Sequence, residues 1–307
     1  MAGSRELHWI DVGTLATGLP LRIAVHELRG DRDGPTVGIS ASIHGDEVTP
    51  VEAVRRLLAG LSPSDISGRL LVAPIVNPLA FQSHTRHTPQ DMQNLNRVFP
   101  GDPDGWLTEQ IGRRFVDGFL DGLDVLLDLH AGGALATVDY AYIENDEALS
   151  RTFDTPILYR GPGYQGTLSA EAVARGIRCV VTEFGGGQVG DELYVESTLS
   201  GLVNALRHVE MLQGEVIDFG PKIIVDELAV IRPHHGGLLV PEFDVDQLGA
   251  AVERDTLLGT IINAQTFETL EEIRAPFNVS LLILLRGVTT RIEAGDYAYI
   301  IGNGAAS

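Results

Sequence analysis

The chain has 307 residues, of which 42 are acidic and 22 basic, and its formal net charge is −20. So large a negative charge argues against nucleic acid and anionic membranes as partners, because both are themselves anionic. Cys179 is the only cysteine, which excludes an intrachain disulfide, and the length is sufficient for two domains.

Targeting and membrane segments are not evident in the sequence. The N-terminal residues lack the apolar run of a signal peptide, and no stretch of 18 apolar residues is present to span a bilayer. We therefore expect a cytoplasmic protein that does not cross a membrane.

The first strong pattern is a strand, a sharp turn and a helix. Residues 21–28 predict one strand, residues 37–43 alternate small and β-branched side chains as a buried strand does, and residues 50–58 have helical spacing. His44 and Glu47 lie in the turn, at the strand end where ligands bind in open α/β sheets. An imidazole and a carboxylate are typical ligands of a catalytic zinc ion. Alternatively, His44 only ends the strand and Glu47 stabilises the helix N-terminus.

A long polar segment follows the next strand, which we predict at residues 69–76. Residues 77–105 have no hydrophobic periodicity, and segments of this kind in compact domains are usually functional or disordered. Arg86, Asn96 and Arg97 stand in it. They are either solvated side chains or an anion-binding group, because a guanidinium matches a carboxylate in a bidentate fashion.

Two further histidines, His84 and His87, lie in the same segment. Imidazoles ligate metals, but histidines in a polar loop are more often solvated or face a substrate. Both interpretations stay open at this point.

Two more buried strands end in side chains that can do chemistry. Residues 124–130 form an apolar strand pattern that ends in His130 and is followed by small residues. Asp128 shares the strand face of His130, since residues two apart align, and it can hold an imidazole in one tautomer. Residues 177–182 predict another buried strand, which ends at Glu183. Taken alone, His130 and Glu183 are equally consistent with ordinary polar strand ends.

The remaining elements divide the chain into two parts. Helices are predicted at residues 106–120, 168–175 and 193–212, with short strands at 138–143 and 156–159. After residue 214, short β-like segments separated by Gly and Asp turns replace the mixture of strands and helices. The sequence therefore predicts an α/β domain at residues 1–215 and a β-rich domain at residues 216–307.

The segment Gly161-Pro-Gly-Tyr-Gln-Gly166 matches the dinucleotide-binding fingerprint G-x-G-x-x-G. Pro162 removes one amide donor, and no intact βαβ nucleotide-binding unit surrounds the segment. A turn that leads into the next helix is the better interpretation.

The strand ends together carry His44 with Glu47, then His130, then Glu183. If these side chains converge, two histidines and one carboxylate can hold zinc and leave a second carboxylate as a base, which is the arrangement of a metallohydrolase.

In this order the motifs resemble the succinylglutamate desuccinylase/aspartoacylase family, relatives of the zinc carboxypeptidases. The motifs are His44-Gly-Asp-Glu47, Asn94-Leu-Asn-Arg97 followed by Phe-Pro-Gly, Asp128-Leu-His130 and Glu183-Phe-Gly-Gly, and they cover about residues 35 to 190. Each motif is weak alone, but the ordered set is specific. The resemblance implies a three-layer α/β/α mixed-sheet domain like that of the zinc carboxypeptidases, followed by a smaller, mainly-β domain.

The resemblance also implies a zinc site and a base. One zinc ion (Zn2+) per chain would be held by His44, Glu47 and His130, with Glu183 as the general base. The implied reaction is hydrolysis of an N-acylated amino acid or a related small amide, so the implied partner is a small molecule. A zinc carboxypeptidase that acts on peptides and a non-catalytic metal-containing binding protein are the alternatives, and a homo-oligomer is compatible with each of them.

For the substrate, the resemblance implies that Asn96 and Arg97 grip a carboxylate and that Arg86 helps to polarise the scissile carbonyl. No counterpart is evident for the further arginine with which the family selects an acidic acyl group. The motifs therefore do not define the acyl group or the amine.

Overall fold

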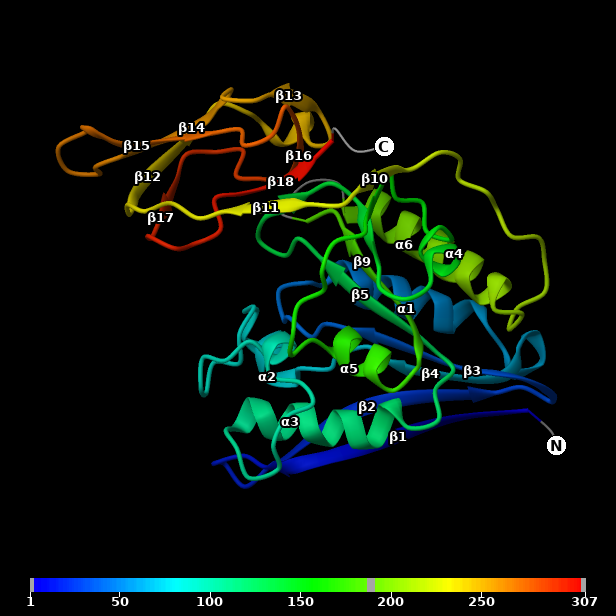
Figure 1. Ribbon diagram of the computed structural model, residues 1–307. Helices are drawn as coiled ribbons and strands as arrows, with labels where there is room; N and C mark the ends of the chain where they lie inside the picture. The colour runs from blue at the N-terminus through cyan, green and yellow to red at the C-terminus, as the bar shows by residue number, and fades with distance from the viewer. Residues whose placement is uncertain (1–2, 187–190, 305–307) are drawn as a thin grey trace.

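The structure is a computed structural model that describes residues 3–186 and 191–304. Figure 1 shows a larger part, in which helices lie on both sides of a sheet, and a smaller part built of strands from the C-terminal third of the chain. We call them the α/β part (the described residues up to 225) and the β-rich part (residues 228–304). Within the described residues, no helix is long and apolar enough to cross a membrane.

In the described residues the main sheet has nine strands, in the order β1-β2-β4-β3-β5-β9-β7-β8-β10. Its centre, β4-β3-β5-β9, is parallel, whereas β2 and β7 run antiparallel to their neighbours there. The bounds are β1 Ser4–Thr14, β2 Pro20–Arg29, β3 Arg32–Ala41, β4 Ser67–Ala73, β5 Val125–Ala131, β7 Tyr140–Ile143, β8 Ile157–Tyr159, β9 Arg178–Phe184 and β10 Ile223–Val225. The three buried strands predicted from apolar runs are thus neighbours at the centre of the sheet.

Helices cover both faces of this sheet, which confirms the predicted three-layer arrangement (Figure 1). On one face, Leu202 of α6 belongs to the same apolar core as Leu127 of β5. On the other face, Phe115 of α3 joins the core around Leu126, which points the opposite way along the same strand. The helices are α1 Thr49–Gly60, α2 Pro78–Ser83, α3 Leu107–Phe115, α4 Glu147–Ser150, α5 Leu168–Ala174 and α6 Asp191–His208, with a π-helical turn at Val116–Leu120 and 3₁₀ turns at Pro63–Asp65, Leu95–Arg97 and Val245–Gln247.

The β-rich part has two small sheets within the described residues. One has the order β11-β18-β16-β13, with β6 of the α/β part paired to β16, and the other has the order β15-β14-β12-β17. The bounds are β6 Ala136–Thr137, β11 Leu228–Ile231, β12 Gly237–Pro241, β13 Ala251–Glu253, β14 Leu257–Ile262, β15 Thr269–Arg274, β16 Val279–Leu285, β17 Thr290–Ile292 and β18 Tyr299–Asn303. The expected domain boundary after residue 215 stays a prediction, and β10, which lies beyond it, pairs with β8 in the main sheet.

The segment 77–105, which the sequence predicts to lack regular structure, contains α2 and a 3₁₀ turn. Asn77 begins α2, because its Oδ1 accepts a hydrogen bond from the Ala80 amide at 3.1 Å. The backbone of Ala80 packs so closely on Gly45 that a Cβ there would lie 2.0 Å from the Ala80 carbonyl carbon. Only glycine fits, and the segment is thereby fixed against the turn that follows β3.

Glu27 on β2 should make the free energy of unfolding of the protein depend on pH in the acid range. Its buried carboxylate accepts hydrogen bonds from Arg69 at 2.8 and 2.9 Å and from Arg29 at 2.6 Å, and these hold the pKa of Glu27 at about 2. A carboxyl whose pKa is lower in the folded chain adds stability above its unfolded pKa of 4.5, and this stability is lost as the pH falls towards 2. Glu27→Gln should therefore lower the free energy of unfolding by about 2 kcal/mol at pH 7 and by about half as much at pH 3.

Urea unfolding at the two pH values measures this difference. Glu6→Gln on the neighbouring strand β1 is the control, since Glu6 is exposed, and it should change the free energy of unfolding by less than about 0.5 kcal/mol. An equal effect of Glu27→Gln at both pH values would show that its charge does not contribute.

Candidate metal centre and active-site pocket

Three side chains from two neighbouring strands meet at the carboxyl edge of the main sheet. β3 and β5 run parallel, with Ala41 opposite Leu129, so the chain leaves β3 next to the end of β5. His44 and Glu47 lie in the turn between β3 and α1, and His130 is the penultimate residue of β5. All three are buried, with exposed fractions of 2%, 1% and 1%.

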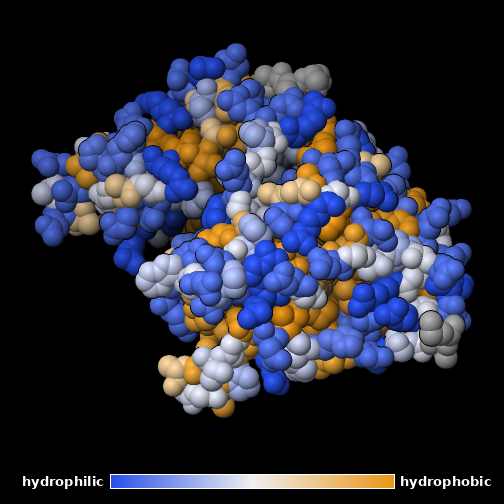
Figure 2. Space-filling view, turned by 60° about the horizontal axis from the view of Figure 1, so that its bottom comes forward, coloured by the Kyte–Doolittle hydropathy of each residue, from blue (hydrophilic) through white to orange (hydrophobic). Residues whose placement is uncertain are grey.

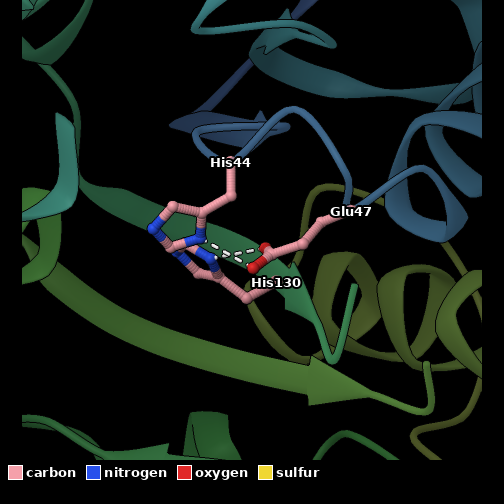
Figure 3. A group of neighbouring side chains, drawn as sticks. All are labelled: His44, Glu47 and His130. Carbon is pink, nitrogen blue, oxygen red and sulfur yellow. Dashed lines mark hydrogen bonds and ion pairs between the residues drawn. The ribbon is translucent and has the colours of Figure 1, made fainter. Parts of the chain in front are cut away.

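The Glu47 carboxylate faces both imidazoles (Figure 3). Its Oε1 is 2.7 Å from His44 Nδ1 and its Oε2 is 2.9 Å from His130 Nδ1, while the ring centroids are 5.0 Å apart. One ligand atom from each residue lies within 4.8 Å of those of the other two. The three residues could therefore hold a metal ion, and two histidines with one carboxylate are a common ligand set of catalytic zinc.

The outer nitrogens of both imidazoles face oxygen atoms. His44 Nε2 is 3.1 Å from Asn94 Oδ1, and His130 Nε2 is 3.4 Å from Oδ2 of the buried Asp128. The Asn94 acceptor at Nε2 of His44 holds the ring proton there and leaves the lone pair of Nδ1, which faces the shared carboxylate, free to bind a metal. At His130 the Asp128 contact is an ion-pair distance without a hydrogen bond. The sequence singled out Asp128 for such a role, but it gave no reason to pair Asn94 with His44.

The electrostatics of these residues also fit a cation. Burial lowers the pKa of His44 to about 4, so this imidazole is neutral at pH 7, as a metal ligand must be. Burial alone would lower the pKa of His130, but the carboxylates of Asp128 and Glu47 outweigh it and raise this pKa well above its usual range. Burial alone would raise the pKa of Glu47, but the two imidazoles hold it well below its usual range. The carboxylates thus favour a positive charge that a metal cation can supply.

Glu183 lies beside this group on β9. β5 and β9 are parallel, and Glu183 is directly opposite His130 in their register. Burial, together with the nearby Glu47 carboxylate, raises the pKa of Glu183 to about 8. In the part of the chain that the structure describes, its carboxylate has neither a hydrogen bond nor an ion pair. With this pKa the group is mostly protonated at pH 7, and a cation held beside it would lower the pKa and leave the carboxylate ionised and able to accept a proton.

Arg86 reaches the same site from the segment after α2. Its Nη1 donates a hydrogen bond to Glu47 Oε1 at 3.0 Å, and its guanidinium also interacts with Glu183. The two other histidines of this segment lie apart: His84 is exposed at the end of α2, and His87 lines the cavity described below. Neither belongs to the metal-ligand group found among the described residues.

Asn96 and Arg97 lie side by side but are used differently. Asn96 is only 7% exposed, its Oδ1 accepts a hydrogen bond from the Leu168 amide at 3.0 Å, and its Nδ2 is 3.3 Å from His130 Nε2. Arg97 donates from Nη1 to the Asn96 carbonyl at 2.6 Å, and its guanidinium lies 4.7 Å from the centre of the Tyr164 ring. Both residues line the cavity, and Arg97 keeps further N–H groups for a ligand. Their grip on a substrate carboxylate stays a prediction.

The metal-ligand group opens into a cavity of about 670 Å³ between the two parts of the molecule. In Figure 2 the β-rich part overhangs the α/β part, and the surface between them is recessed. The pairing of β6 with β16 brings the β-rich part to this edge of the sheet. The sequence analysis missed several wall residues, namely Tyr142, Glu144, Tyr164 and Ser169 of the α/β part and Arg232, Arg286, Asp296 and Tyr297 of the β-rich part.

Tyr297 positions two of the missed arginines. The Arg232 guanidinium lies 4.1 Å from the centre of its ring, and Arg286 Nε donates a hydrogen bond to its carbonyl oxygen at 2.7 Å. With Arg86 and Arg97, four arginines among the described residues line the cavity of a chain whose net charge is −20. Four acidic side chains of the described residues, Asp46, Glu144, Glu183 and Asp296, line the cavity as well. The argument for an anionic ligand group therefore rests on the guanidinium of Arg97, which keeps N–H groups free to bind a carboxylate.

Comparison with known proteins identifies the family of the chain. A family model described as the succinylglutamate desuccinylase/aspartoacylase catalytic domain matches residues 33–209. The N-alpha-acetyl-L-2,4-diaminobutyric acid deacetylase of Halomonas elongata is 32% identical over 223 residues, which are 67% of this chain and 65% of that protein. The match thus spans somewhat less than two thirds of the relative's length.

Solved structures share the whole architecture. A succinylglutamate desuccinylase from Silicibacter sp. is 28% identical with a TM-score of 0.85, and the match covers 99% of this chain and 95% of that one. The product-bound ectoine utilization protein EutE (DoeB) from Ruegeria pomeroyi is 27% identical with a TM-score of 0.85, covering 98% and 95%. These matches confirm the predicted fold. Because the family model covers more than half of the chain and its matched region includes all four motifs of the site, the chain belongs to the succinylglutamate desuccinylase/aspartoacylase family.

Proposed function

We propose that this protein is a zinc-dependent hydrolase that removes the acyl group from an N-acylated amino acid or a related small amide. The observation that carries the proposal is the buried group of His44, Glu47 and His130, of which both histidines line the cavity, with the Glu183 carboxylate on the strand next to His130. A site that only bound a metal would not need a free base beside it. Glu183 therefore favours an enzyme over a non-catalytic binding protein.

The chain's own residues can carry the proton transfers. A zinc ion held by His44, Glu47 and His130 would supply a Lewis acid, which makes water more acidic and stabilises negative charge on a carbonyl oxygen. Glu183 can accept a proton from the attacking water at its carboxylate and donate it to the leaving amine. Arg86 can hydrogen-bond the carbonyl oxygen as negative charge develops there.

The cavity favours a small substrate with an anionic group. Its volume is in the range of small-molecule sites, and the β-rich part forms one wall, which leaves less room for a peptide than an open cleft would. Arg97 and Asn96 are proposed to bind the carboxylate of the amino acid. The relatives named as a deacetylase and a desuccinylase support the same class of substrate. The protein is proposed to act in the cytoplasm, and its net charge of −20 argues against nucleic acid and anionic membranes as partners.

A screen of N-acetyl, N-succinyl and N-formyl amino acids against the zinc-loaded protein, read by release of the free amine, tests the proposal. We expect turnover that a chelator abolishes and added zinc restores. Turnover that rises from dipeptides to longer peptides would instead assign a carboxypeptidase. A zinc-loaded protein that turns over none of these compounds would be a binding protein.

Arg97→Lys tests the grip on the carboxylate. Lysine keeps the positive charge but loses the bidentate fork and the contact of the guanidinium with the Tyr164 ring, so the variant tests geometry rather than attraction. We expect kcat/KM to fall by about 10-fold or more, roughly 1.4 kcal/mol, for substrates with a free carboxylate, with zinc content unchanged. Amine release and elemental analysis measure the two quantities.

The methyl ester of the same substrate is the control for Arg97→Lys. It lacks the carboxylate, so it should be poor for both proteins and differ little between them. A variant that hydrolyses the carboxylate substrate as well as the parent does would make Arg97 a loop residue without a role in binding.

A further inference from the structure

The strand β1 leaves one edge of the main sheet open. It is the outermost strand of that sheet, and within the described residues it pairs only with β2. Figure 1 shows it at the bottom of the α/β part, on the side away from the β-rich part. An open edge of 11 residues can pair with another chain, and proteins commonly block such an edge with lysine, proline or a bulge. Residues 4–10 contain neither lysine nor proline, and the register shift of β1 lies beyond them, between Asp11 and Gly13.

The backbone groups of the odd-numbered residues of β1 point towards this open edge. The Gly30 amide, directly after β2, donates a hydrogen bond to β4. Successive residues of a strand alternate between its two neighbours, so the even residues of β2 bond towards β4 and its odd residues towards β1. Val25 of β2 is opposite His8, so the backbone of His8 faces β2. The residues on either side of His8, namely Leu7 and Trp9, therefore present their N–H and C=O groups at the open edge.

The side chains along this edge form a pattern that is complementary to itself. Leu7 is 49% exposed and Trp9 is 54% exposed, and both lie on one face of the strand, since residues two apart align. On the same face, Arg5 precedes them and contacts the end of α1, and Asp11 follows them and contacts β2. The order along this face is thus positive, apolar, apolar, negative. When the strand is reversed, each position of this order faces a suitable partner.

We infer that two copies of the chain pair antiparallel through the open edges of β1, about a two-fold axis at His8. This register places Leu7 of each copy opposite Trp9 of the other and Arg5 opposite Asp11, and both kinds of pair stabilise facing strands. An axis at Leu7 would instead place Trp9 opposite Arg5, and an axis at Trp9 would place Leu7 opposite Asp11. Because the two-fold axis uses the same surface of both copies, the assembly closes as a dimer. The inference is independent of the proposed hydrolase function.

The dimer should be reversible. A single pair of strands makes an interface at the small end of the range for specific complexes, and two chains of net charge −20 repel each other. Sedimentation equilibrium should therefore show monomer and dimer in exchange, with more dimer as the protein and salt concentrations rise, because salt screens the repulsion. A chain that stays monomeric up to about 1 mM would overturn the inference.

The variant His8→Cys tests the position of the axis. In the proposed register the two copies of residue 8 face each other with their Cα atoms about 4.5 Å apart, within the range of a disulfide. Oxidised glutathione should therefore convert the variant into a covalent dimer on a non-reducing gel. The parent should give no covalent dimer, because its Cys179 is buried.

Glu6→Cys is the matched control for His8→Cys. It places the same thiol on the same face of β1 at an exposed position, but the two copies would lie about 14 Å apart along the paired strands. It should give little covalent dimer. Equal cross-linking of the two variants, or none in His8→Cys, would overturn the inference.

Two substitutions test which side chains face each other. Trp9→Lys should raise the dissociation constant of the dimer by about 10-fold or more, because it removes apolar area and places a lysine opposite Leu7. Adding Leu7→Glu should restore much of the affinity, since each glutamate then faces a lysine of the other copy. Both positions are exposed, so the fold of the single chain should be kept.

Phe267→Lys is the matched control for Trp9→Lys, because it makes the same kind of change at an aromatic residue that is 71% exposed in the β-rich part. It should leave the dissociation constant unchanged. A dimer that Trp9→Lys does not weaken would use another surface of the molecule. A double variant that recovers no affinity would exclude the axis at His8, and either result would overturn the inference.

Discussion

Glu183→Gln is expected to lower kcat by about 10²-fold or more without loss of zinc. The amide keeps the size and shape of the side chain but cannot take a proton from water. Glu183 also lies outside the group of residues that could bind the metal, so the metal should stay in place. Amine release and elemental analysis of the same preparation separate the loss of the base from a loss of metal.

The matched control for Glu183→Gln is Asp46→Asn, which removes a second carboxylate from the same cavity wall. Asp46 Oδ1 is buried and has no hydrogen-bond partner among the described residues, so it is the next candidate for the base. We expect Asp46→Asn to lower kcat by less than about 10-fold. If Asp46→Asn is the slower of the two variants and Glu183→Gln keeps near-normal turnover, then Glu183 is only a polar strand end.

The metal-ligand group could be predicted from the sequence because its residues follow recognisable strands. β3, β5 and β9 are buried apolar runs, and in a parallel sheet the ends of neighbouring strands meet at one edge. His44 and Glu47 share one turn, while His130 and Glu183 end the next two strands of the sheet. The topology therefore brings together side chains that local patterns had already located.

Features that depend on tertiary contacts could not be predicted in this way. Arg232 and Tyr297 reach the cavity only because β6 pairs with β16, and no local pattern indicates that contact. Glu144 lies in the cavity because β7 pairs antiparallel with β9, which the sequence left undetermined.

The edge strand β1 was missed for another reason. It buries little, with Val12 as its one buried residue, so its hydrophobic pattern is too weak to recognise.

His44→Ala and His130→Ala should each lower the affinity for zinc by more than about 100-fold, and activity should be lost with the metal. Each variant leaves two protein ligands where three converge, and it places the Glu47 carboxylate next to an empty space instead of an imidazole. Elemental analysis after dialysis measures the retained zinc. The melting temperature gives a second readout that does not depend on turnover, because zinc should raise it in the parent and not in the two variants.

His87→Ala is the control for His44→Ala and His130→Ala, because it removes a histidine of the cavity that is not a proposed metal ligand. His87 lines the same cavity and is a histidine of the same polar segment, but it lies outside the metal-ligand group of the described residues. It should keep the zinc content and the zinc-dependent rise in melting temperature of the parent. Loss of zinc from His87→Ala with full retention in His44→Ala would show that the metal binds near His87 and not at His44. Full retention in both His44→Ala and His130→Ala would remove the metal from this site altogether, and Glu183 would then have no metal beside it to activate the water.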